Sequence, residues 1–85
     1  MEITFVEVKK VEKEDSNVRG FVTIHFDDCF AVHDIRIIEG KKGLFVAMPN
    51  KKTKYGNFRD VAHPLNRELR EKVHDAVLEE YNKIK

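Results

Sequence analysis

Alternation of apolar and polar residues predicts β-strands in the first part of the chain. The clearest alternation covers residues 21–26, where Val22, Ile24 and Phe26 fall on one face, the two-residue period of a half-buried strand. Residues 2–11 alternate less regularly, but their β-branched content favours a strand. The change of parity inside this segment indicates a bulge. The polar residues 12–20 between the two strands are expected to form an exposed hairpin loop.

A third strand is predicted over residues 29–38, after a tight turn at the two preceding aspartates. Its apolar positions are even-numbered up to Val32 and odd-numbered from Ile35, so the parity slips at His33 and Asp34. Either a β-bulge lies there, or the two faces of the strand are buried at different points along its length.

The five apolar residues 44–48 predict a strand buried on both faces, because no side is left for water. The glycine-bounded segment 39–43 before it is expected to form a hairpin turn. Pro49 ends the strand, since proline has no N–H to donate. Asn50 and Gly56 then supply turn chemistry at the two ends of a loop.

Residues 57–62 alternate as a fifth strand, and residues 67–84 predict one amphipathic helix with Asn66 as its N-cap. Helical spacings of three and four relate its apolar residues, which are Leu69, Val73, Ala76, Val77, Tyr81 and Ile84. The expected fold class is α+β: a five-stranded, mainly antiparallel meander sheet followed by a C-terminal amphipathic helix. The length predicts a single domain over residues 1–85.

Apolar residues occupy both faces of the predicted sheet, although one helix can cover only one face. Phe21 and Phe45, for example, compete with Ile24 and Val46 for the covered side. Apolar residues on the uncovered face, or an edge strand without a neighbour, predict a homodimer formed by sheet packing or by strand addition.

Charge is distributed unevenly along the chain despite a formal net charge of only +1. Residues 36–59 carry seven basic side chains and one acidic side chain, a local charge of +6. Residues 1–35 carry −4 and residues 60–85 carry −1. Such a basic segment favours an anionic partner. A solvated basic loop without a binding role is equally compatible with the charge alone.

The basic loop after Pro49 has the composition of a phosphate-binding site. Lys51, Lys52 and Lys54 are flexible cations, Tyr55 can stack or donate a hydrogen bond, and Arg59 lies on the strand that leaves the loop. These five residues are the candidate nucleic-acid site. Lysines favour contacts to the phosphate backbone over reading of bases, so we expect modest sequence specificity.

Other chemistry has little support in the sequence. Spacings typical of metal sites or phosphate loops are missing, and we expect no catalytic residue, no metal, no cofactor and no small-molecule substrate. His33 and His63 are interpreted as structural hydrogen-bonding residues, and Cys29 as a small buried side chain. The chain has no apolar run of roughly 20 residues and no signal-peptide pattern, so we expect no membrane partner and a cytoplasmic location.

Four segments together resemble the stage V sporulation protein G (SpoVG) family. They are VHDIRII at 32–38, GLFVAMPNKKT at 43–53, FRDVAHP at 58–64 and DAVLEEY at 75–81. The resemblance covers nearly the whole chain, and the combination of GLFVAMP, a basic stretch and FRDVAHP is specific.

The resemblance implies a small β-sheet domain with a C-terminal helix that forms a dimer, binds DNA and RNA and regulates gene expression. In spore formers it implies a role in septation and sporulation. The family's nucleic-acid contacts map onto Lys51, Lys52 and Lys54. Many relatives have arginine there, and lysine lacks the bidentate fork, which predicts weaker site selectivity. The alternative function is a protein-interaction module of the division machinery, acting through an exposed sheet edge or apolar face.

Overall fold

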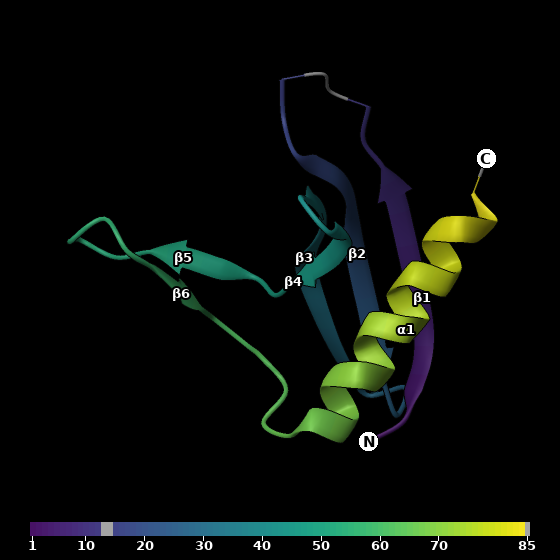
Figure 1. The fold of residues 1–85 in the computed structure, drawn as a ribbon. Helices are drawn as coiled ribbons and strands as arrows, with labels where there is room; N and C mark the ends of the chain where they lie inside the picture. The colour runs from purple at the N-terminus through teal and green to yellow at the C-terminus, as the bar shows by residue number, and fades with distance from the viewer. Residues whose placement is uncertain (13–14, 85) are drawn as a thin grey trace.

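The computed structural model describes residues 1–12 and 15–84. Within them, β1 to β4 form one antiparallel sheet in sequence order, while β5 and β6 form a separate two-stranded sheet. Helix α1 lies across one face of the larger sheet (Figure 1). The element bounds are β1 Ile3–Lys10, β2 Val18–Phe26, β3 Phe30–Gly40, β4 Gly43–Ala47, β5 Asn50–Lys52, β6 Phe58–Asp60 and α1 Arg67–Lys83.

Two tight connections set the order of the large sheet. Between β2 and β3, Asp27 and Asp28 both have a φ of 53°. The Cys29 N–H donates to the Phe26 carbonyl at 3.1 Å, and two positive φ values are the pattern of a hairpin turn of type I′. The predicted aspartate turn is confirmed. The turn predicted at 39–43 also forms, with Gly43 at a φ of 123°.

The predicted change of parity in the third strand is a β-bulge. Val22 pairs with Ile35 and Ile24 pairs with Val32, so two residues of β3 stand opposite one residue of β2. Asp34, one of the two, has a φ of 63°. Because the extra residue reverses the alternation, Val32 and Ile35 face the same side of the sheet. A second register shift near the start of β1 confirms the irregularity expected there.

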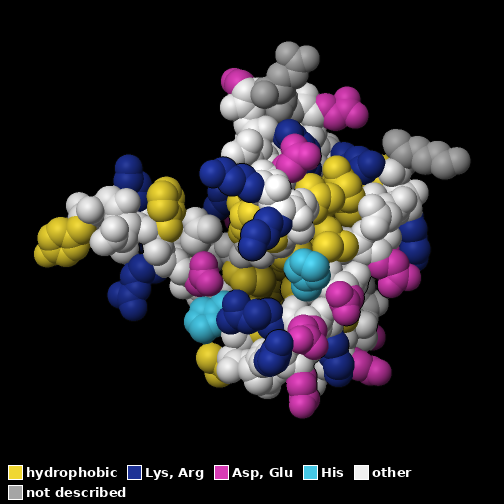
Figure 2. Space-filling view, in the orientation of Figure 1, with side chains coloured by type: hydrophobic (Ala, Val, Ile, Leu, Met, Phe, Trp, Pro, Cys, Tyr) yellow, Lys and Arg dark blue, Asp and Glu magenta, His cyan; other side chains and the backbone are white. Residues whose placement is uncertain are grey.

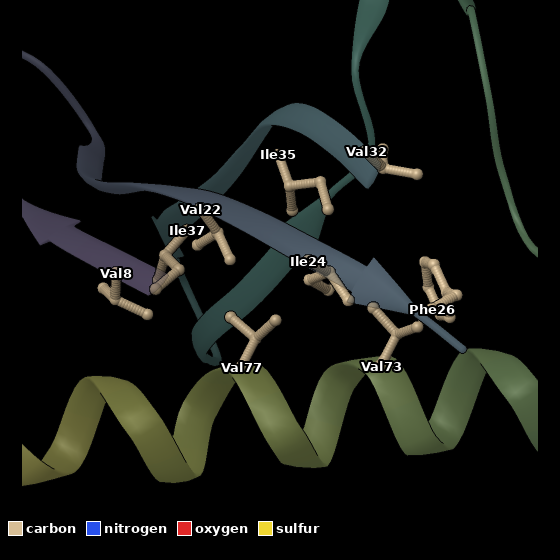
Figure 3. Close-up of a cluster of buried hydrophobic side chains, with 9 residues drawn as sticks. All are labelled: Val8, Val22, Ile24, Phe26, Val32, Ile35, Ile37, Val73 and Val77. Atoms are coloured by element: carbon tan, nitrogen blue, oxygen red, sulfur yellow. The ribbon is translucent and has the colours of Figure 1, made fainter. Parts of the chain in front are cut away.

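The core lies between this sheet face and the helix (Figure 3). Ile24, Ile35, Ile37 and Val77 are each 0% exposed. Burying one such side chain stabilises the fold by about 1.5–3 kcal/mol. The helix begins where predicted, because the Asn66 side chain accepts a hydrogen bond of 2.8 Å from the Leu69 N–H. The whole buried cluster is Val8, Val22, Ile24, Phe26, Val32, Ile35, Ile37, Val73 and Val77.

Three expectations about the strands are wrong. The sheet has four strands rather than five, because the predicted strand at 57–62 shortens to β6 and pairs with β5 outside the large sheet. Residues 44–47 of the predicted run belong to β4, an edge strand with half-buried and exposed residues that is not buried on both faces. Pro49 follows it and turns the chain away. The polar loop predicted at 12–20 is shorter, because β2 starts at Val18; residues 13 and 14 lie outside the described part.

Candidate nucleic-acid interface

The candidate residues lie on a hairpin arm, which we define as residues 50–60 with strands β5 and β6. The arm extends away from the large sheet (Figure 1). Its register pairs Asn50 with Asp60, Lys51 with Arg59 and Lys52 with Phe58. The chain therefore forms an ordered β-hairpin where the sequence predicted a loop followed by a strand.

A three-residue turn closes the tip of the arm. The Thr53 N–H donates to the Asn57 carbonyl at 2.6 Å, and the Gly56 N–H donates to the Thr53 carbonyl at 3.0 Å. Gly56 has a φ of 86°, a left-handed conformation that glycine adopts without a steric penalty. This pattern is a β-turn followed by a glycine bulge, and it places Lys54 and Tyr55 at the tip.

The base of the arm is fixed by polar contacts to the body. The Asn50 Oδ1 accepts a hydrogen bond of 3.2 Å from the Arg36 guanidinium, and the Asn50 Nδ2 donates to the Met48 carbonyl at 3.2 Å. The Val61 N–H donates to the Pro49 carbonyl at 2.7 Å. Asn50 is thus the first residue of β5 and an anchor, and not the turn residue that the sequence predicted.

The structure brings all five candidate residues onto this arm but not onto one face. Lys51 and Arg59 are cross-strand partners and share a face, whereas Lys52 lies on the other face beside Phe58. Lys54 and Tyr55 lie at the tip, where the Lys54 ammonium is 5.2 Å from the centroid of the Tyr55 ring. Figure 2 shows cationic and hydrophobic side chains together on the arm. All five are exposed, Tyr55 at 80%.

The electrostatics of the arm favour an anion. Like charges directly opposite each other on paired strands destabilise the pairing, and Lys51 stands opposite Arg59. Within the described residues, no ion pair involves the arm's cations; the pairs that form join Arg19 to Glu39, Arg67 to Glu71, His74 to Asp75 and Lys83 to Glu80. A bound phosphate group would relieve this repulsion.

Sequence reasoning missed the exposed apolar residues of the same region. Phe58 and Val61 are each 69% exposed, although their alternation suggested that they pack in the core. The detectable signal was their position shortly after three lysines of the same segment, with Arg59 between them, which is unusual for a core strand. Lys41 and Lys42 lie in the β3–β4 turn, at the opposite end of β4 from the arm.

The remaining candidates of the sequence have structural contacts. His33 Nδ1 lies 3.1 Å from the Thr23 hydroxyl, and His63 Nδ1 lies 3.0 Å from the Pro64 carbonyl, so both form the hydrogen bonds predicted for them. Cys29 is exposed, which contradicts the buried side chain that we expected. In the described residues, His, Cys, Asp and Glu side chains form no group of three that could hold a metal ion.

No helix of the described chain is long and apolar enough to cross a membrane. The fold and the arm together define a small α+β protein with an exposed cationic hairpin. Similarity to known sequences identifies the family to which this protein belongs.

The sequence model of the SpoVG family matches residues 1–83. The chain is 50% identical over 84 residues to a protein of Phytoplasma australiense, an alignment that covers 99% of this chain and 86% of the relative. It is 51% identical over 83 residues to a protein of Clostridium beijerinckii, with 98% and 90% covered. A protein of Caldicellulosiruptor saccharolyticus is 48% identical, with 99% and 94% covered. All three relatives carry the name septation protein SpoVG.

The chain therefore belongs to the SpoVG family, and the resemblance inferred from its motifs is confirmed. This is not a known enzyme family.

Proposed function

We propose that this chain is a dimeric nucleic-acid-binding regulator that contributes to septation and, in spore formers, to sporulation. The septation role is supported by the names of its relatives. Nucleic-acid binding is supported by the arm, where cations without carboxylate partners in the described chain share one hairpin with an exposed tyrosine, and Lys54 lies beside its ring. Its ligand is the phosphate backbone of DNA, and of RNA where Tyr55 stacks on an unpaired base.

The main support for nucleic-acid binding is the cross-strand pair of Lys51 and Arg59, with Lys52 and Lys54 on the same exposed hairpin. An exposed hairpin can enter a groove or follow a strand while its flexible lysines adjust to the phosphates. Because these side chains are ammonium groups with one guanidinium, most of the binding energy is electrostatic and depends on salt.

The test replaces Lys51, Lys52 and Lys54 together by alanine and measures duplex-DNA affinity from low to moderate salt. Each lost phosphate contact reduces the slope of log K against log salt by about 0.9, so three lost contacts reduce it by about 2.7. The matched control replaces Lys41, Lys42 and Lys72, which removes the same charge outside the arm. An unchanged affinity and slope in the folded arm variant would contradict nucleic-acid binding by the arm.

A protein-interaction module of the division machinery is the second candidate. Phe5 and Phe21 are 45% and 46% exposed, and their pairing with His25 and Lys9 places them on the sheet face that the helix leaves uncovered. Two exposed aromatic side chains on one face favour contact with a protein. Binding to a division protein that survives the lysine substitutions but is lost in Phe5→Ser and Phe21→Ser would favour this candidate.

A further inference from the structure

Strand β4 leaves one edge of the large sheet open. It pairs with β3 from Gly43 to Ala47, and within the described chain no strand pairs with its other side. Such an edge presents backbone N–H and C=O groups to which an extended peptide can bind as an added strand. Because β4 has five residues and Pro49 follows two residues after it, the edge admits a short segment and not a long strand.

A groove lies beside this edge, between β4 and the first half of α1. It holds about 140 Å³, and its lining is mainly apolar, with Val46, Met48 and Val73 among the residues that form it. A cavity of roughly 150 Å³ holds a benzene molecule, so the groove has room for one aliphatic side chain. Since the side chains of a strand alternate between two faces, a strand added to β4 would direct such a side chain towards the groove.

Basic side chains lie at both ends of this site. Arg70 and His74 line the groove near the end of β4, and Lys41 and Lys42 lie in the turn before its first residue. Within the described chain, Arg70 and the two lysines form no ion pair, and Asp75 is the carboxylate beside His74, at 3.7 Å. Figure 2 shows hydrophobic side chains on this side of the molecule, with basic side chains and a histidine beside them.

These features favour an acidic peptide over a nucleic acid or a second copy of β4. Phosphates require cations but gain nothing from an apolar groove or from open backbone groups. Antiparallel pairing of β4 with itself would bring the lysines of one turn close to Arg70 of the other chain, because Met48 and Arg70 line the same groove. Like charges at this distance would oppose the pairing.

We propose that the β4 edge binds an extended acidic segment of a partner protein as an added strand. An apolar side chain of the segment occupies the groove, while carboxylates at its two ends contact Arg70 and His74 on one side and the lysines of the turn on the other. Backbone hydrogen bonds supply affinity, and the groove and cations supply specificity. The inference rests on the protein-interaction module of the proposed function and is independent of nucleic-acid binding by the arm.

The test measures the fluorescence anisotropy of a labelled heptapeptide that has three central valines and two glutamates at each end. We expect saturable binding with a dissociation constant below about 1 mM. Methylation of the three valine nitrogens removes the backbone donors and should weaken binding about tenfold or more. A peptide with lysines in place of the glutamates should also bind about tenfold or more weakly, because its charge matches that of the site.

Two variants of the chain locate the charged contacts. The combined change Lys41→Ala, Lys42→Ala and Arg70→Ala removes three exposed cations from the ends of the site, and should weaken peptide binding about tenfold. The matched control is the alanine variant of the three arm lysines, which loses the same charge elsewhere and should bind the peptide as the parent does. Circular dichroism checks that both variants are folded.

Amide shifts in nuclear magnetic resonance spectra identify the surface that the peptide contacts. Changes at residues 43–48 and 70–74 would support the proposal, whereas changes confined to the arm or to the face with Phe5 and Phe21 would overturn it. Absence of saturable binding, or equal binding of the methylated or the lysine peptide, would also overturn it.

Competition by duplex DNA separates the peptide site from a nucleic-acid site. With the arm variant as the binding chain, displacement of the peptide by DNA would assign the cations beside β4 to phosphates and overturn the proposal. Retention of the peptide would support it. The salt dependence of DNA binding by the arm is a separate measurement, so failure of the peptide site and failure of nucleic-acid binding are distinguishable.

Discussion

Deletion of Asp34 tests whether the bulge in β3 determines which residues form the core. With the bulge, His33 and Asp34 both stand opposite Thr23, and Val32 and Ile35 face the helix. Without Asp34, one residue of β3 stands opposite Thr23, and regular alternation from Val32 onwards keeps Ile35 and Ile37, each 0% exposed, on the covered face. The deletion should therefore leave the core in place. A reversed alternation would instead expose Ile35 and Ile37, at a cost of about 3–6 kcal/mol.

The expected change in unfolding free energy is thus within about 1 kcal/mol, small beside the 5–15 kcal/mol typical of a domain. Urea unfolding followed by far-ultraviolet circular dichroism measures it. Asp34→Gly is the matched control, because glycine keeps the residue count and readily adopts the φ of 63°. We expect this control to stay within about 1 kcal/mol of the parent. A loss of about 3–6 kcal/mol in the deletion variant alone would mean that Ile35 and Ile37 had turned outwards, and would refute the assigned role of the bulge.

Two further substitutions test the core and the arm separately. Val77→Ala removes two methyl groups from a position that is 0% exposed. It should lower the unfolding free energy by about 2 kcal/mol in the same urea assay. An unchanged unfolding free energy would mean that the helix is not packed against the sheet as described. Gly56→Ala places a side chain at a φ of 86° and should destabilise the tip turn by about 1 kcal/mol, visible as a loss of amide-exchange protection at Thr53 with global stability unchanged.

Local pattern predicted most of the secondary structure. The alternation in β2, the parity slip at Asp34 and the Asn66 cap each depend on neighbours in sequence, and each is confirmed. The strand at 57–62 was also recognised in part, but periodicity does not say with which strand a segment pairs. Its partner is β5 because the chain leaves the sheet at Pro49 and the turn at Gly56 closes a local hairpin.

The residues of the candidate site could be predicted from the sequence, but their arrangement in space could not. Lys51, Lys52, Lys54, Tyr55 and Arg59 follow from charge and residue type, since phosphate contact requires cations and stacking requires a ring. Their distribution over two faces and a tip depends on the register of the hairpin. That register is set by the turn at residues 53–57, a segment predicted from the sequence to be part of a loop.

Two features of the arm destabilise its hairpin in an isolated chain. Lys51 and Arg59 repel each other across the strands, and Phe58 is exposed to water, so both features weaken the hairpin that carries them. A phosphate beside Lys51 and Arg59 would reduce the first penalty. Because Phe58 shares its face with Lys52 and not with Lys51, a partner that covered Phe58 would bind the opposite side of the arm from that phosphate. Occupation of either side would then stabilise the hairpin, since each partner would remove one of the two penalties.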